Sequence, residues 1–160
     1  VAISGACASL ATAYLLHVAH PSLVMVLALG AFTTGTILMM TAPVEQSYWY
    51  QSFFGLLVMT FGMDMSFPAA TLILSNSVKR EHQGIAASLV STIVNYSISL
   101  GLGFAATVEV NINKGGESKE DLLIGYRSAW YMAVGLAGLG LAVSIVYFIK
   151  SMWLQKKVGQ

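Results

Sequence analysis

Long apolar stretches separated by short polar segments follow one another along the whole chain. Residues 1–44 contain no Asp, Glu, Lys or Arg, which is too long for one crossing of a bilayer core about 30 Å thick, since about 20 helical residues suffice. The polar residues His17 and His20, followed by Pro21, divide this stretch in two, because proline suits the first turn of a helix. The pattern predicts five transmembrane helices, at about residues 2–18, 21–42, 48–76, 84–109 and 128–150.

The composition favours a membrane protein over a soluble one. Hydrophobic residues make up 56% of the chain and charged residues only 9%, whereas soluble domains carry about 25% charged residues. The net charge of +1 gives no basic surface for nucleic acid. We therefore expect an all-α, polytopic, integral membrane protein that contacts the lipid bilayer and has no nucleic-acid partner.

The distribution of Lys and Arg predicts the orientation. One side of the membrane would carry five basic residues: Lys79, Arg80, Lys150, Lys156 and Lys157. The other side would carry three, diluted by four acidic residues: Lys114, Lys119 and Arg127, with Glu45, Glu117, Glu120 and Asp121. Because the excess of basic residues lies on the cytoplasmic side, we expect a cytoplasmic C-terminus.

Asp64 is the main candidate for chemistry. It is the only Asp, Glu, Lys or Arg between Gln46 and Val78, and a charge at the centre of a bilayer costs about 3 kcal/mol or more. Pro68, four residues on, has no N–H and clashes with the Asp64 carbonyl, which predicts a break in the helix. At 100° per residue, one face of this helix also carries polar residues, which we take as lining a cavity together with Pro68: Thr60, Thr71 and Ser75.

Two interpretations of Asp64 stay open. In the first, the carboxylate binds a proton or a cationic substrate in a cavity, because burial favours its protonated form and allows proton exchange. In the second, Asp64 only hydrogen-bonds a neighbouring helix. Ser75 lies 11 residues from Asp64, about 16 Å along a helix, which places the carboxylate near the middle of the core.

The next helix carries a stripe of small and polar residues centred on Asn95. The serines of this stripe are further candidates for lining a cavity: Ser88, Ser91 and Ser99. Asn95 lies 11 residues from Gly84, so its depth matches that of Asp64, and the two would share a cavity as candidates for transport and proton coupling. The alternative is a tight helix pair joined by hydrogen bonds across the contact.

The remaining sequence offers no other chemistry. Small residues in two helices indicate packing surfaces: Gly30, Ala31, Thr34 and Gly35 in residues 21–42, and Ala133, Gly135, Ala137, Gly138 and Gly140 in residues 128–150. No Walker A motif, metal-spaced His or Cys cluster, or nucleophile–base pair is present in the sequence. We expect no enzyme, no metal and no cofactor.

Several motifs resemble fungal transporters of the major facilitator superfamily. They are GMDMSFPAA at residues 62–70, EHQGIAASLV at 81–90, VNYSISLGLG at 94–103 and GYRSAWY at 125–131. The chain is most similar to the aminotriazole-resistance type among the 14-helix drug:proton antiporters. This resemblance implies that residues 1–160 form the C-terminal part of the transporter domain. The helices at 2–18, 48–76 and 84–109 would line the central cavity, and the other two would be peripheral.

The resemblance also implies a function. We expect proton-coupled efflux of small organic molecules, as a multidrug or toxic-compound antiporter of the plasma membrane, in which protons are the second partner. Because the first residue is Val1 and it lies inside an apolar run, we expect N-terminal helices of the same transporter to be missing. The alternatives are an uptake permease on the same scaffold and a membrane fragment that does not transport. One departure from the family is the turn from His17 to Pro21, where such transporters often have basic residues.

Overall fold

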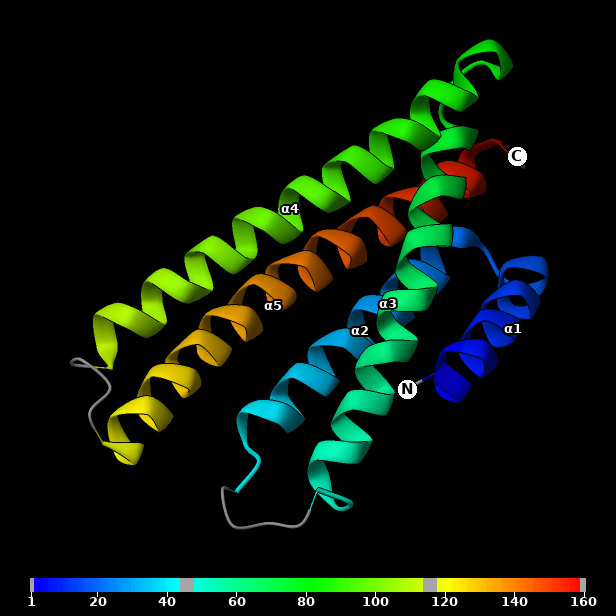
Figure 1. Ribbon diagram of the computed structural model, residues 1–160. Helices are drawn as coiled ribbons and strands as arrows, with labels where there is room; N and C mark the ends of the chain where they lie inside the picture. Colours follow the sequence, from blue (N-terminus) through cyan, green and yellow to red (C-terminus); the bar gives the residue numbers. More distant parts are fainter. Residues whose placement is uncertain (1, 44–47, 114–117, 159–160) are drawn as a thin grey trace.

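The computed structural model describes residues 2–43, 48–113 and 118–158, and within these ranges every regular element is a helix. Five α-helices follow one another, with a short 3-10 helix (η1, Arg80–His82) before the fourth (Figure 1). Their bounds are Ala2–Val18 (α1), Pro21–Met40 (α2), Gln51–Asn76 (α3), Gln83–Ile112 (α4) and Lys119–Val158 (α5). Glu45, Lys114 and Glu117, which entered the predicted orientation, lie outside the described residues.

The fifth helix is much longer than predicted. It begins at Lys119 rather than near residue 128 and ends at Val158 rather than near residue 150. The prediction followed the apolar stretch alone, whereas the charged ends are also helical. Acidic residues in the first turn and lysines in the last turn interact favourably with the helix dipole, which explains the extension.

Of the other predicted helix ends, three differ by two or three residues, and the rest agree within one residue. Helix α2 ends at Met40 rather than near 42, and α4 ends at Ile112 rather than near 109. Helix α3 begins at Gln51, because residues 48–50 form a turn rather than the first helical residues. The ring of Trp49 in this turn lies 5.4 Å from that of Phe53 in α3.

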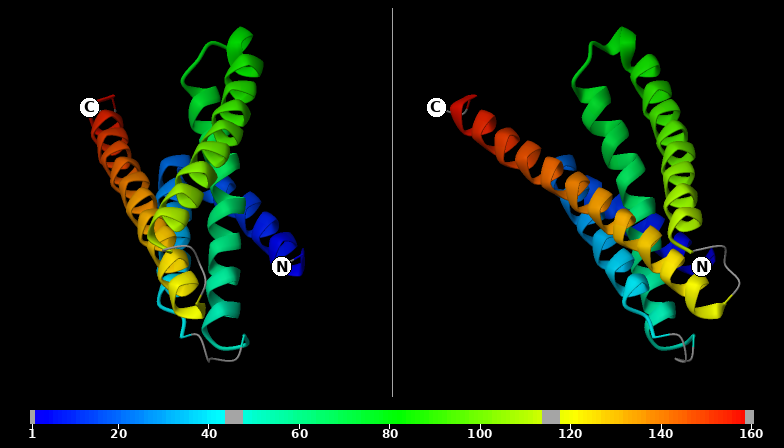
Figure 2. Two further views of the ribbon diagram at one scale, coloured as in Figure 1. Left: turned by 60° about the vertical axis from the view of Figure 1, so that its left-hand side comes forward. Right: turned by 90° about the vertical axis from the view of Figure 1, so that its left-hand side faces the viewer.

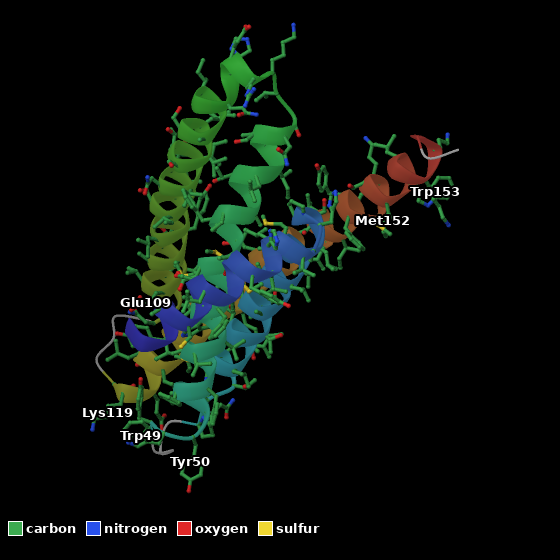
Figure 3. All side chains as sticks on the ribbon, turned by 90° about the vertical axis from the view of Figure 1, so that its right-hand side faces the viewer. Trp49, Tyr50, Glu109, Lys119, Met152 and Trp153 are labelled. Carbon is green, nitrogen blue, oxygen red and sulfur yellow. The ribbon has the colours of Figure 1, made fainter. Side chains whose placement is uncertain are left out.

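In the part of the chain that the structure describes, four helices are long and apolar enough to cross a membrane, namely α2, α3, α4 with η1, and α5. Helix α1 is apolar but has only 17 residues. Helix α5 has 40 residues, about 60 Å at 1.5 Å per residue, so it is about twice as long as a bilayer core is thick. Figure 3 shows Trp49 and Tyr50 at one end of the bundle with Lys119, and Trp153 at the opposite end of α5. Exposed aromatic residues at both ends are typical of the two membrane interfaces.

Helix α2 lies at the centre of the bundle. It packs along α3 on one side and against α5 on the other, while α1 packs mainly on α3 and α4 contacts both α5 and α3. In both views of Figure 2, the C-terminal part of α5 diverges from the hairpin of α3 and α4. The buried core lies between α2 and α3, and its central residues are Val24, Ala28, Met65 and Ala69.

Glycines bring α2 and α3 into close contact. A Cβ atom on Gly62 would lie 2.7 Å from the Phe32 amide nitrogen and 2.8 Å from the Ala28 carbonyl oxygen. A Cβ atom on Gly35 would lie 2.9 Å from that of Met59. The packing role predicted for Gly35 is therefore confirmed. Such close approach is typical of small residues at helix contacts in membranes.

Of the small residues predicted to form a packing surface on α5, Ala137 is buried, whereas the glycines contact no other helix of the described chain. A Cβ atom on Gly135, Gly138 or Gly140 would meet no atom of the described residues within 4 Å, and the same holds for Gly30 in α2. Ala137 and Ser144 are seven residues apart, on one face of α5, and both are buried, so this face packs within the described residues. The mere presence of small residues therefore does not identify the packed side of a helix.

A side-chain clamp joins α2 to α3 next to the turn of residues 48–50. The Gln51 amide nitrogen donates to the Leu38 carbonyl at 2.9 Å and to the Thr41 hydroxyl at 2.7 Å. The last four carbonyls of an α-helix have no donor within the helix, and the carbonyl of Leu38 is one of the four in α2. The clamp satisfies one of these carbonyls and fixes the start of α3 beside the end of α2.

Candidate functional site

Asp64 lies at the middle of α3. It precedes the last residue of the helix, Asn76, by 12 residues, about 18 Å along the axis. Its side chain is half-buried and points toward α1, where a Cβ atom on Gly5 would lie 3.4 Å from the Asp64 Oδ2 atom. Gly5 precedes the end of α1 at Val18 by 13 residues. Since α1 and α3 run in the same direction, the two residues lie at similar depth.

The Asp64 carboxylate accepts no hydrogen bond and forms no ion pair within residues 2–43, 48–113 and 118–158. This differs from the hydroxyl groups of Thr60, Ser66 and Thr71 on the same helix, which donate to carbonyls of α3. A carboxylate without a donor is costly in an apolar surrounding unless it is protonated, hydrated or bound to a cation. Asp64 is therefore chemically distinct from the other polar residues of α3.

Pro68 does not break the helix, contrary to the prediction. Helix α3 is continuous from Gln51 to Asn76 with Pro68 inside it. Because Pro68 has no N–H, the Asp64 carbonyl loses its donor four residues on. Prolines are tolerated in this way in membrane helices when neighbouring groups adjust. Residue 64 thus presents two acceptors, its carboxylate and its carbonyl.

The side of α1 that faces Asp64 consists of small residues. Ala8 and Thr12 follow Gly5 at three and seven positions, on one face of the helix, and both are buried. The Thr12 hydroxyl donates to the Ala8 carbonyl at 2.7 Å, and that of Ser9 donates to the Gly5 carbonyl at 2.9 Å. None of these residues was predicted to lie beside Asp64, although their spacing places them on one face of a helix.

The other candidates on α3 are half-buried. They are Thr60, Pro68, Thr71 and Ser75. The Thr60 hydroxyl donates to the Leu56 carbonyl at 2.8 Å, and that of Thr71 to the Phe67 carbonyl at 2.9 Å. Both threonines thus satisfy their hydrogen bonds within α3, and their role in lining a cavity stays a prediction.

Asn95 is not brought into contact with Asp64 in the part of the chain that the structure describes. It is exposed on α4, and its amide nitrogen donates to the Ser91 carbonyl at 3.0 Å. The buried residues of α4 are Ala86 and Val90, and Asn95 lies about 140° around the helix from Val90. A cavity shared by Asn95 and Asp64 therefore stays a prediction.

The serines of α4 bond to their own helix. Ser88 and Ser99 are exposed, and Ser91 is half-buried. Their hydroxyl groups donate to the carbonyls of Ile85, Asn95 and Ala87 at 2.9, 3.1 and 3.5 Å, respectively. These bonds run within α4, whereas the predicted alternative required bonds across a helix contact. The side of α4 that carries Asn95 is consequently open to lipid or to further helices.

Comparison with known proteins points to one family. The family model described as Major Facilitator Superfamily matches residues 1–157. The low affinity ammonium transporter of Saccharomyces cerevisiae is 55% identical over 98% of this chain and 30% of its own length. The efflux pump terJ of Aspergillus terreus is 51% identical over 91% of this chain and 28% of its own length. The aminotriazole resistance protein of S. cerevisiae is 40% identical over 93% of this chain and 27% of its own length.

These comparisons define the extent of the similarity. The resemblance of the motifs to fungal transporters, including one of the aminotriazole-resistance type, is confirmed. The chain spans about 30% of the length of the ammonium transporter that it matches. It matches no solved structure.

Proposed function

Because the chain belongs to the major facilitator superfamily, we propose that it is the C-terminal part of a proton-coupled exporter of small organic molecules. The observation that carries this proposal is Asp64, a carboxylate at the middle of α3 that has no hydrogen-bond donor among the described residues. Such a group can take up and release a proton, because an apolar surrounding favours its neutral form and an aqueous one its charged form. A change of surroundings during transport would couple the proton to the substrate.

The rest of the pathway requires further helices. Transporters with alternating access bind their substrate between two repeats or bundles, and this chain has the five helices α1 to α5 in its described part. The open side of α4, with Asn95 and its serines, would face those helices. We therefore assign residues 1–160 to the C-terminal part of the domain, with the N-terminal helices of the same transporter as its partner.

The names of the relatives support export and also offer a second candidate function. Export agrees with an efflux pump and an aminotriazole resistance protein among them. The second candidate is transport of a small cation, because the relative at 55% identity is named an ammonium transporter. In that case Asp64 would bind the cation itself, and transport could run inward as in an uptake permease.

The orientation follows from the basic residues. Lys79 and Arg80, between α3 and α4, are exposed, as are Lys150, Lys156 and Lys157 in the C-terminal part of α5. The turn from α3 to α4 and the end of α5 lie toward the same side of the bundle (Figure 1). This side would be cytoplasmic. We propose a multi-pass protein of the plasma membrane with its C-terminus inside the cell.

The decisive experiment is flux driven by a pH gradient in proteoliposomes that contain the full-length transporter carrying residues 1–160. We expect Asp64→Asn to abolish coupled flux, because asparagine cannot exchange a proton. Asp121→Asn, in the first turn of α5, is the matched control and should keep the flux. Unchanged flux in Asp64→Asn would remove Asp64 from coupling. Flux by the 160-residue chain alone would contradict its assignment as one part of the pathway.

A further inference from the structure

The C-terminal end of α5, from residue 150 to residue 158, continues the helix beyond its apolar part and diverges from α3 and α4 (Figure 2). It carries three lysines, Lys150, Lys156 and Lys157, and no acidic residue. We propose that this end of α5 is a docking surface for anionic phospholipids, in which the lysines bind lipid phosphates and Trp153 anchors the helix among the headgroups. This inference goes beyond the proposed transport and does not depend on Asp64.

The positions of these residues along α5 match the layers of a bilayer. Residues 128–149 contain no Asp, Glu, Lys or Arg, and as a helix they span about 33 Å, close to the thickness of the hydrocarbon core. Trp153 follows Ile149 by four residues, which places it about 6 Å further along the axis, within the headgroup layer. Lys156 and Lys157 lie about 10–12 Å beyond Ile149. Because Cα–Cβ bonds tilt toward the N-terminus of a helix, these two long side chains can reach back to the phosphates.

The lysines surround Trp153 on one face of α5. One lies three residues before it, and the other two lie three and four residues after it, all within about 60° around the helix. The same face continues toward the membrane with Ile149 and Val146, and the side chains of Val146, Ile149 and Trp153 are all exposed. An apolar strip that leads through an indole ring to ammonium groups follows the change from acyl chains to headgroups.

The charge of this end is available to an external anion. The three lysines are exposed, and none of them forms an ion pair with a residue that the structure describes. The opposite end of α5 differs, because Lys119 is followed there by Glu120 and Asp121. Each lysine near an anionic membrane surface strengthens the attraction by a factor of about five. Under the proposed orientation, the lysines face the cytoplasmic leaflet, which contains the anionic lipids.

Trp153 itself serves as the reporter in the test. The chain with Trp49→Phe and Trp130→Phe is reconstituted in vesicles, where lipids brominated on their acyl chains quench the fluorescence of the remaining tryptophan on contact. We expect brominated phosphatidylserine to bind beside Trp153 at least about five times more tightly than brominated phosphatidylcholine. This preference should fall when the salt concentration rises from about 0.01 M to about 1 M, because the Debye length falls from about 30 Å to about 3 Å.

Two sets of variants isolate the lysines. Glutamine at all three positions (Lys150→Gln, Lys156→Gln and Lys157→Gln) should abolish the preference, whereas arginine at the same positions should keep it. A second reporter chain, with Trp130→Phe and Trp153→Phe, retains only Trp49. Figure 3 shows Trp49 with Lys119 at the opposite end of the bundle, so this chain should show no preference between the two lipids.

Equal quenching by the two lipids would overturn the proposal and leave the lysines as a solvated helix end. A preference that persists with glutamine at the three positions would overturn it as well. If the tryptophan substitutions prevent folding, native mass spectrometry of the wild-type chain in an equal mixture of the two lipids decides. Phosphatidylserine should then be retained over phosphatidylcholine, and equal retention would contradict the proposal. Neither measurement requires transport, so its result is separate from the flux measured in Asp64→Asn.

Discussion

Gly62→Ala tests whether the contact between α2 and α3 is as tight as the structure indicates. The added Cβ atom would lie 2.7 Å from the Phe32 amide nitrogen, 2.8 Å from the Ala28 carbonyl oxygen and 2.9 Å from the Phe32 Cα atom. Ordinary contacts begin near 3.4 Å, so the helices must separate by about 0.7 Å. All three neighbours are backbone atoms, which cannot rotate away as a side chain could.

Two opposing terms set the expected magnitude. Overpacking of a well-packed contact costs about 1–3 kcal/mol, while replacing glycine by alanine inside a helix stabilises it by about 1 kcal/mol. Gly138→Ala is the matched control, because its Cβ atom would meet nothing within 4 Å in the described part of the chain. We expect the control to be slightly stabilised and Gly62→Ala to lie about 2 kcal/mol below it, a factor of about 30 in the unfolding equilibrium.

The assay is reversible unfolding of the chain in detergent micelles, followed by circular dichroism as denaturant is added. Both variants are compared with the wild type under the same conditions. If Gly62→Ala stabilised the chain as much as Gly138→Ala does, the backbones of α2 and α3 would lie further apart than in the structure. That result would refute the close backbone contact between α2 and α3 at Gly62.

Three further changes probe other parts of the molecule. Gln51→Leu removes two hydrogen bonds between α2 and α3 and should lower the free energy of unfolding by about 1–3 kcal/mol in the same assay. Pro68→Ala supplies an N–H for the Asp64 carbonyl, so it should stabilise α3 in the same assay; under the proposed function it should also reduce coupled flux in proteoliposomes. Cys7 is an exposed free cysteine, so a thiol reagent should label the native chain once, and Cys7→Ser should abolish the labelling without a change in stability.

The helices themselves could be predicted from the sequence, because an apolar stretch of about 20 residues in a bilayer must satisfy its own backbone hydrogen bonds and therefore forms a helix. The ends of α5 could not, since hydropathy reports the part of a helix that lies in lipid and not the part that extends into water. The charged residues at both ends of α5 continue the helix beyond the apolar stretch. Capping and dipole effects, rather than burial, decide where such a helix ends.

The neighbours of Asp64 were harder to predict than Asp64 itself. Helical periodicity gives the face of α3 that carries Asp64, and residue counting gives its depth. Neither quantity gives the direction in which a neighbouring helix lies. Their equal depth in the membrane led to the prediction that Asp64 and Asn95 share a cavity. The structure instead places Gly5 of α1 beside the carboxylate and leaves Asn95 exposed on α4. Close packing of small residues, seen only in three dimensions, decides which helices meet.

A polar stripe on a membrane helix is weak support for a water-filled pathway. The hydroxyls of Thr60 and Thr71 donate to carbonyls of their own helix, and the amide of Asn95 does the same on α4. Such groups are already satisfied, so they tolerate lipid or a packed neighbour as well as water. A carboxylate differs because it has no proton to donate when ionised and must accept from another group. Asp64 finds no such group among the described residues, so it requires a proton, water or a cation, unlike the hydroxyl and amide groups of the stripe, and its carboxylate is where we expect the transport chemistry.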